Sequence, residues 1–331
     1  MEKTDIELLD RAPQEKNAIK IIGVGGGGGN AVNHMFREGI NSVDFILCNT
    51  DSQALKNSPI PTHVHMGHNE LRPFNHPKWG HQAAEECEPE LRSMLNDGTK
   101  MTLVIAGMGG GTGNGAAPVI ANISKELDIL TVGIITLPFK FEGPNKIEQA
   151  LDGIKKMAKH VDSLVVINNE CLWEIYPEMS VLEAFDKADE ALYLIAKSLA
   201  EVITVHGLIN LDINDMKCIL TNGGVTFIGI GYGEGENSVR NAIEDAIHSP
   251  FLNGNDVFKS KRHLLNITIA NEDSSSCLMM EDIHYIDDFQ AKFGEEFEIM
   301  WGLKIDPKLG RRVKATILAT GYDLNIESQH I

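Results

Sequence analysis

The sequence predicts an α/β fold, with a doubly wound parallel sheet joined by a long central helix to a smaller α+β domain. Apolar strand-like runs alternate with amphipathic helical segments up to residue 178, as in a parallel sheet covered on both faces. An uninterrupted apolar stripe at helical spacing follows, and from Gly224 the order of strands and helices changes. The predicted parts are an arm (1–17), the sheet domain (18–178), the central helix (179–206), a polar segment (207–223), the smaller domain (224–321) and a tail (322–331).

The composition is that of a soluble globular protein. Of 331 residues 43% are hydrophobic and 23% are charged, and the length allows two domains with cores of their own. The formal charge of −18 argues against nucleic acid as a partner, because phosphate backbones attract basic surfaces. The first residues lack a signal-peptide pattern, and no run approaches the ~18 apolar residues of a membrane span. We therefore expect a cytoplasmic protein without direct membrane insertion, whose five cysteines are free thiols.

The first element is the apolar run 19–24, predicted as a strand buried on both faces. Five glycines (25–29) and Asn30 follow it, and residues 31–38 form a helical pattern that ends at Gly39. A glycine run between a buried strand and a helix is typical of a phosphate-binding turn. The run also contains G-x-G-x-x-G, so the dinucleotide-binding turn of an oxidoreductase is an alternative.

The next strand, 43–48, ends in Asn49-Thr50-Asp51, polar groups placed where a ribose or a metal-bound phosphate could lie. Residues 57–81 are predicted to be rich in loops, because prolines stand at 59, 61, 73 and 77. This segment also carries histidines at 63, 65, 68, 76 and 81. Histidines in an exposed, proline-broken loop are usually solvated, so we predict no metal site from them.

The central feature of the sequence is the glycine loop 107–115, Gly-Met-Gly-Gly-Gly-Thr-Gly-Asn-Gly. It lies between the apolar strand 101–106 and a segment, 116–127, that is compatible with a helix. Six glycines in nine positions allow a ligand to approach the backbone closely, and the helix adds its positive dipole end. A flexible surface turn is the alternative, but the order strand, glycine loop, helix favours a phosphate cradle.

Further polar residues follow the next two strands. The turn after the strand 131–137 carries Glu142 and Lys146, and the strand 163–167 is followed by Asn169. Glu142 and Lys146 could also be a solvated ion pair of little energetic weight. Because the carboxyl ends of parallel strands share one edge of a sheet, both glycine loops and these residues are expected to form one nucleotide site.

The central helix is predicted from a capping box, Ser180 with Glu183, followed by a long apolar stripe that ends near Gly207. Phe185 and Asp189 lie one turn apart near its start, at the nucleotide edge of the sheet. Spacing alone favours a core position for Phe185 over a platform for a base.

Beyond this helix the sequence carries Asn210, Asp212 and Asp215. A helix of this length spans ~35 Å at 1.5 Å per residue, so these side chains cannot reach phosphates bound in their own chain. An ordinary polar loop is one interpretation, and a role toward a second chain is the other.

The last part of the chain predicts a smaller α+β domain without a cluster of catalytic residue types. Strands are expected at 225–230, 264–270, 298–305 and 312–320, and helices at 237–248 and 281–293.

Taken together, these motifs resemble the FtsZ family, the tubulin-like GTPases of bacterial cell division, over residues 18–321. The matching stretches are 22–30, 49–51, 109–115, 139–143 and 210–212 with Asp215. The loop GGGTGNG stands for the tubulin signature GGGTG[ST]G, which is highly specific. Tubulin and its plasmid and archaeal homologues share that loop, whereas the first glycine run and the ending 315–321 resemble FtsZ.

The resemblance implies a GTPase that polymerises head-to-tail into the filaments of the division ring, with itself and other division proteins as partners. GTP phosphates would lie on Gly26, Gly27, Gly28, Gly29, Asn30, Gly110, Gly111, Thr112 and Gly113. Glu142 and Lys146 would contact the ribose side, and Asn169, Phe185 and Asp189 would hold the guanine. Asn210, Asp212 and Asp215 would enter the site of the next subunit, where the aspartates polarise the attacking water. Without a phosphate-loop lysine, phosphate charge would be met by backbone amides, helix dipoles and Mg²⁺.

The sequence departs from the family pattern at four places. Asn114 replaces Thr or Ser, a small change in a cradle built from backbone, and Lys146 replaces Arg, losing a bidentate fork. Residues 69–81 lack the glycine-rich loop that senses the γ-phosphate, and the sequence ends at Ile331 without the linker and tether-binding peptide of the family. These departures leave open a divergent paralogue that binds nucleotide and regulates assembly with weak hydrolysis; a shortened chain would also explain the ending.

Overall fold

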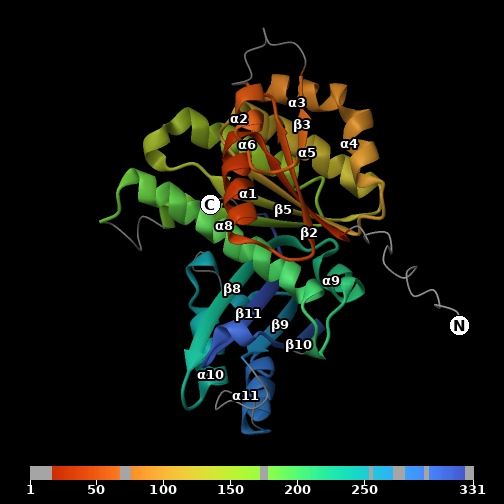
Figure 1. The fold of residues 1–331 in the computed structure, drawn as a ribbon. Coiled ribbons are helices and arrows are strands. Elements are labelled where there is room, and N and C mark those ends of the chain that lie inside the picture. Colours follow the sequence, from red (N-terminus) through yellow and green to blue (C-terminus); the bar gives the residue numbers. More distant parts are fainter. Residues whose placement is uncertain are drawn as a thin grey trace, which may run out of the picture.

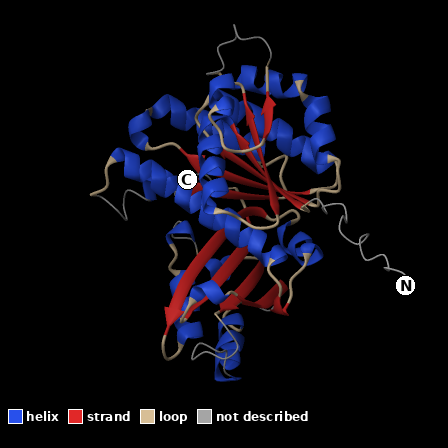
Figure 2. Ribbon diagram, in the orientation of Figure 1, coloured by secondary structure: helices blue, strands red, loops and turns tan. Residues whose placement is uncertain are grey.

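The structure is a computed structural model that describes residues 17–67, 76–171, 178–252, 256–270, 280–293 and 298–324. Figure 1 shows a larger α/β part above a smaller part, with the helix α8 running diagonally between them, and Figure 2 shows the strands of both parts in the same view. The predicted arm up to residue 16, most of the 69–81 loop, Cys277 and the end of the tail lie outside the described residues.

The larger part is a parallel sheet of six strands in the order β3-β2-β1-β4-β5-β6. Alternate residues of β1 enter opposite apolar clusters, Ile19 and Ile21 on one face and Ile22 and Val24 on the other, so the sheet is doubly wound as predicted. The strands are β1 (Ile19–Val24), β2 (Val43–Asn49), β3 (Thr62–His65), β4 (Met101–Gly107), β5 (Leu130–Leu137) and β6 (Ser163–Asn168). The helices are α1 (Gly25–Glu38), α2 (Ser52–Lys56), α3 (Pro77–Glu86), α4 (Glu88–Leu95), α5 (Gly111–Glu126) and α6 (Pro144–Met157).

The smaller part continues the same sheet in the order β8-β11-β9-β10-β7. Two residue pairs join β6 to β8, so the parts share one sheet of 11 strands. Within the smaller part β9 and β10 are parallel, and the other neighbours are antiparallel. The strands are β7 (Gly207–Ile209), β8 (Gly224–Glu234), β9 (Arg262–Ile269), β10 (Glu298–Ile305) and β11 (Arg312–Tyr322). The helices are α9 (Ile213–Leu220), α10 (Ser238–Ile247) and α11 (Met280–Gln290).

The central helix α8 (Val181–Thr204) has 24 residues and begins at the predicted capping box. The Ser180 hydroxyl accepts a hydrogen bond from the Glu183 amide at 3.3 Å, and the Glu183 carboxylate accepts one from the Ser180 amide at 2.8 Å. Its apolar stripe packs into the cluster on one face of the larger sheet. None of the described helices is both long enough and apolar enough to span a membrane.

Several elements differ from the sequence prediction. Helices α1 and α5 begin at Gly25 and Gly111, inside the glycine runs, because close packing overrides the low helix propensity of glycine. An added Cβ on Gly113, for example, would lie 2.5 Å from the Gly107 carbonyl oxygen. The segment 57–81 contains the strand β3 and the start of α3, where His76 accepts a hydrogen bond from the Lys78 amide. Helix α9 occupies part of the polar segment after α8.

Candidate functional site

A cavity of about 500 Å³ opens at the carboxyl edge of the larger sheet, where strands β1, β4, β5 and β6 end. The structure brings most of the predicted nucleotide-binding residues to this cavity. Those that line it are Gly26, Gly27, Asn30, Gly110, Gly111, Thr112, Gly113, Glu142, Lys146, Asn169, Phe185 and Asp189. The convergence that the strand order predicts is therefore present in the fold.

Two helix starts lie next to each other at one end of the cavity. Helix α1 begins after β1, and α5 begins after Gly110, whose backbone is extended. Within the described chain no side chain caps either helix, and neither first turn contains an acidic residue. Gly25 and Gly109 have φ values of +71° and +100°, a conformation that favours glycine. Free amide groups and two positive dipole ends make this end of the cavity suited to an anion such as phosphate.

The glycines of the two runs have different surroundings. An added Cβ on Gly26 or Gly110 would meet no atom within 4 Å, because these positions face the open cavity. An added Cβ on Gly28 would lie 2.2 Å from the Ile105 carbonyl oxygen, and one on Gly29 would lie 3.0 Å from the Leu47 side chain. Gly28 and Gly29 do not line the cavity, in contrast to their predicted place at the phosphates; they allow α1 to pack closely on the sheet.

Asn114 connects the central glycine loop to the neighbouring helix α6 by hydrogen bonds. Its side-chain oxygen accepts a hydrogen bond from the Gly109 amide at 3.0 Å, and its side-chain nitrogen donates one to the Gln149 carbonyl of α6 at 2.6 Å. The side chain is buried, and an added Cβ on Gly153 would lie 2.8 Å from it. Asn114 thus links the central loop to α6 through two different side-chain atoms, the oxygen toward Gly109 and the nitrogen toward Gln149.

Glu142 and Lys146 form an ion pair at the side of the cavity. The ammonium of Lys146 donates to the Glu142 carboxylate at 3.1 Å, and the same carboxylate accepts a hydrogen bond from the Phe139 amide at 3.0 Å. Both side chains line the cavity, and among the described residues Lys146 is its one cationic side chain. Both charged groups are therefore placed to contact a polar ligand in the cavity in exchange for their mutual ion pair.

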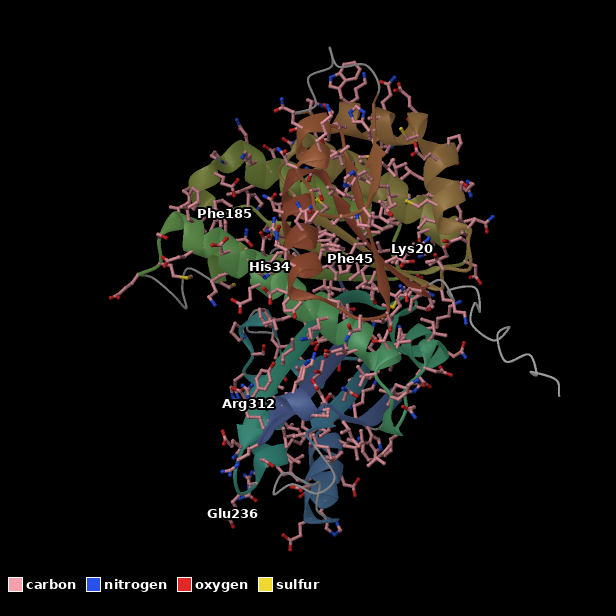
Figure 3. All side chains as sticks on the ribbon, in the orientation of Figure 1. Lys20, His34, Phe45, Phe185, Glu236 and Arg312 are labelled. Carbon is pink, nitrogen blue, oxygen red and sulfur yellow. The ribbon has the colours of Figure 1, made fainter. Side chains whose placement is uncertain are left out.

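The other end of the cavity combines an aromatic ring with two polar side chains. Phe185 is 42% exposed and meets Phe139 edge-on at a centroid distance of 5.3 Å, so it is not a core residue (Figure 3). The side-chain oxygen of Asn169 is buried and finds no hydrogen-bond partner among the described residues. Burial raises the pKa of the Asp189 carboxyl to about 7, with the charge of Asp186 as the second cause. This end offers acceptors and a ring face to a planar, donor-rich ligand.

Asn210, Asp212 and Asp215 lie beyond the far end of α8 and do not line the cavity. The Asp212 carboxylate accepts hydrogen bonds from the amides of Asn214 (2.6 Å) and Asp215 (3.1 Å), which lower its pKa below the ordinary value. The Asp215 carboxylate accepts one from the Asp212 amide at 2.7 Å, so the two aspartates form the capping box of α9. The Asn210 side chain accepts one from the Gly207 amide at 2.7 Å. We call residues 207–215 the acidic loop.

Sequence reasoning missed several residues that line the cavity and misplaced others. Thr136 lies near the end of β5 and Pro138 directly follows it, and Ala188 and Leu192 lie on the face of α8 that also carries Phe185. Their helical spacing from Phe185 is the signal that could have identified the last two. Asn49, Thr50 and Asp51 were expected at a ribose or phosphate, but they do not line the cavity. Thr50 instead contacts Thr112 through their hydroxyls at 2.8 Å, and Asp51 caps α2.

The candidate histidines have separate surroundings. His76 caps α3, His81 lies 3.3 Å from the Glu85 carboxylate, and His68 lies outside the described residues. Over the described ranges no three or more His, Cys, Asp or Glu side chains are grouped so that they could hold a metal ion.

Comparison with known proteins identifies the family. Residues 18–177 match the Tubulin/FtsZ family, GTPase domain, and residues 224–323 match the FtsZ family, C-terminal domain. The chain is 48% identical to the cell division protein FtsZ of Porphyromonas gingivalis, over 95% of this chain and 69% of that protein. It is 40% identical to FtsZ of Azotobacter vinelandii, over 95% of this chain and 79% of that protein.

Comparison of the fold with solved structures indicates the same family. A structure of FtsZ from M. jannaschii, described as an empty dimer, superposes with a TM-score of 0.83 at 35% identity, covering 93% of this chain and 89% of that one. CetZ1 from Haloferax volcanii has a TM-score of 0.78 at 22% identity, which shows the shared fold. The oxidoreductase alternative is thereby excluded, and guanine nucleotide is the ligand class of the GTPase domain. The chain belongs to the FtsZ family of tubulin-like cell-division GTPases.

Proposed function

We propose that this chain binds GTP in the cavity, polymerises head-to-tail, and hydrolyses GTP at the contact between successive subunits. One observation carries the proposal: the cavity is lined by residues of the first half of α8, whereas the acidic loop follows the last residue of this 24-residue helix, which is ~36 Å long. Water activation needs an oxygen within hydrogen-bond reach, so another chain has to supply the acidic loop. A head-to-tail contact of this kind does not close on itself and gives filaments. The M. jannaschii relative, described as a dimer, is consistent with self-association.

At the phosphate end, amide groups from the starts of α1 and α5 would hold the β- and γ-phosphates. Mg²⁺ would neutralise phosphate charge and would take its ligands mainly from phosphate oxygens and water, since the described residues offer no metal-binding cluster of their own. Glu142 and Lys146 would exchange their ion pair for contacts on the ribose side.

At the base end, the Asp189 carboxylate would accept hydrogen bonds from N1–H and N2–H of guanine. The side-chain oxygen of Asn169 is buried and has no hydrogen-bond partner in the described chain, so the base would donate a hydrogen bond to it. Phe185 would pack against the ring of the base. Adenine has no N1–H and no 2-amino group, so ATP would leave the Asp189 carboxylate buried without donors.

The affinity for GDP should fall about tenfold between pH 8 and pH 6. The pKa of the ligand-free Asp189 carboxyl is about 7, so roughly nine tenths of it is ionised at pH 8 and roughly one tenth at pH 6. Guanine donors favour the ionised form and lower the pKa in the complex, so binding releases a proton below pH 7 and weakens as the pH falls. Calorimetric titration across this range measures the effect.

The matched control for the pH series is Asp189→Asn, which cannot titrate. Its remaining pH dependence reports the nucleotide phosphates, whose second pKa is near ~6. Equal pH dependence in the wild type and in Asp189→Asn would show that Asp189 does not contact the base.

For hydrolysis, Asp212 and Asp215 of one subunit would accept hydrogen bonds from the water that attacks the γ-phosphorus in the next subunit. The bridging oxygen leaves with GDP, and the proton of the water passes to solvent. Asn210, held by the Gly207 amide, would orient this loop in the contact. Such filaments would act in the cytoplasm at the division site, together with other division proteins.

A second candidate is a paralogue that binds GTP but regulates assembly with weak hydrolysis. The unusual sequence of residues 69–81 favours it, but 68–75 lie outside the described residues. The acidic loop argues against it, because both aspartates are present and held as a capping box. Steady phosphate release by assembled protein would separate the two candidates.

The proposed function is tested by adding GTP, GDP or ATP to purified protein and measuring sedimented polymer and displacement of labelled GDP. GTP should displace GDP and produce polymer, whereas ATP should do neither because of the contacts proposed at Asp189. Equal displacement by ATP and GTP would contradict the guanine site. Displacement by GTP without polymer at any protein concentration would contradict the filament.

A further inference from the structure

We propose that strand β10 holds the acidic loop in its catalytic position and that Lys304 is a positioning residue for GTP hydrolysis. The inference rests on the proposed role of Asp212 and Asp215, and it adds the part of the molecule that sets where these carboxylates lie. It is carried by a buried ammonium at the end of α8 and by the packing of β10 against the acidic loop.

Lys304 caps the end of the central helix. Its side chain is almost fully buried, at 1% exposed, and its ammonium donates to the carbonyls of Glu201 (2.6 Å), Val202 and Val205 (2.7 Å). Carbonyls in the last turn of a helix lack partners within the helix, and a cation there also complements the helix dipole. Three acceptors match the three N–H donors of the ammonium. Burial lowers the pKa of Lys304 to about 8, opposed by the charge of Glu201.

The backbone of β10 is the template for the start of the acidic loop. Strand β7 pairs antiparallel with β10, and Lys304 lies opposite Gly207. The two backbones are so close that a Cβ on Gly207 would lie 2.1 Å from the Leu303 carbonyl oxygen. Gly302, directly before Leu303, completes the contact: the Leu211 side chain packs over it, and a Cβ on Gly302 would lie 2.7 Å from that side chain. Successive residues of β10 therefore fix the chain from the end of α8 to the residue before Asp212.

This packing affects hydrolysis because few other contacts hold Asp212 in its position. Its side chain is exposed. In the described structure, all the hydrogen bonds that this side chain accepts come from residues in the first turn of α9. Its location relative to the next subunit thus depends on the segment before it. A displacement of about 1 Å in a catalytic group can cost roughly a hundredfold in rate. The nucleotide cavity is lined by residues of the first half of α8, whereas Lys304 contacts its last turn, so the affinity for nucleotide should not depend on Lys304.

The test is Lys304→Met, which keeps the length of the apolar stem and removes the ammonium. We expect kcat per sedimented subunit to fall about tenfold or more, with KM for GTP, GDP affinity and the sedimented fraction unchanged. Lys314→Met is the matched control. Lys314 comes from the neighbouring strand β11 and also contacts Glu201, through its carboxylate at 3.1 Å, but it donates to no carbonyl at the helix end. Lys314→Met should retain wild-type kcat.

Wild-type kcat in folded Lys304→Met would overturn the inference, and so would a parallel loss of kcat and nucleotide affinity, which indicates general destabilisation. If Lys304→Met does not fold, Gly207→Ala decides, because its Cβ would separate β7 from β10 while the Lys304 ammonium is retained. It should reproduce the selective loss of kcat, and wild-type kcat would refute the template. Failure of the proposed function is recognised separately: Asp212→Asn would then hydrolyse GTP at the wild-type rate.

Discussion

Asp212→Asn should bind GTP and polymerise like the wild type but hydrolyse GTP at least about a hundredfold more slowly. Asparagine is as good a helix N-cap as aspartate, so its side-chain oxygen can still accept from the Asn214 and Asp215 amides. The carboxylate that polarises the attacking water is lost, and a group of this kind contributes roughly 10²–10⁴ in rate. Phosphate release at saturating GTP, normalised to sedimented protein, measures the change.

The control for this substitution is Asp256→Asn, which makes the same replacement at another helix cap. Asp256 accepts a hydrogen bond from the Phe258 amide at 3.0 Å in the smaller domain, away from the cavity and the acidic loop. Its turnover should equal that of the wild type. Asp212→Asn at wild-type turnover, with normal assembly, would remove Asp212 from the reaction.

Gly110→Ser should bind GDP about 10- to 100-fold more weakly, without a change in the melting temperature of the ligand-free protein. The Gly110 backbone (φ −95°, ψ 163°) suits any L-residue, and an added Cβ meets no atom within 4 Å. The free space there is the cavity itself, so the new side chain would occupy the place of phosphate oxygens. Loss of one charge-assisted hydrogen bond, worth about 1.5–3 kcal/mol, accounts for the expected range.

Two further glycines make the Gly110 experiment selective. Gly26→Ser introduces a side chain from the other helix start, also into open space, and should weaken GDP binding in the same way. Gly113→Ser should instead lower the melting temperature, because its Cβ would lie 2.5 Å from the Gly107 carbonyl oxygen. Unchanged GDP affinity in both Gly110→Ser and Gly26→Ser would mean that the two helix starts do not hold the phosphates.

Sequence patterns were sufficient for the elements whose signal is local. The apolar run of β1 and the Ser180 capping box each predict an element that the structure contains, because a buried strand and a capped helix follow from neighbouring residues. The convergence on one edge followed from the parallel order of the strands, a general property of open α/β sheets. Spacing alone favoured a core position for Phe185 because the same helical stripe serves the core and the cavity, whereas the family resemblance placed it at the nucleotide.

The remaining features depend on contacts between residues far apart in the sequence. Helix α1 begins at Gly25 rather than at residue 31 because Gly28 packs against Ile105, which glycine propensity alone does not reveal. The fastening role of Asn114 requires the Gln149 carbonyl, 35 residues away. Lys304 meets carbonyls about 100 positions earlier, so its sequence neighbours give no indication of its burial.

Hydrolysis in trans also predicts complementation between Asp212→Asn and Gly110→Ser at a GTP concentration too low to fill the Gly110→Ser site. In filaments that contain both, Gly110→Ser subunits would present wild-type Asp212 to GTP bound by Asp212→Asn subunits. Mixing should therefore restore part of the activity that each protein lacks alone. Co-sedimentation establishes that Gly110→Ser subunits enter the filaments, and absence of restored activity in such mixed filaments would contradict the contact.

The most direct test of the central claim is turnover per subunit as a function of total protein concentration. If the acidic loop of one chain completes the site of the next, dilute monomer should be nearly inactive, because its own acidic loop follows the far end of α8, at least ~18 Å along the helix from Leu192 in the cavity lining. Activity per subunit should then rise above a threshold that coincides with the appearance of sedimentable polymer. Activity per subunit that stays constant from dilute monomer upward would mean that the catalytic site is complete within one chain.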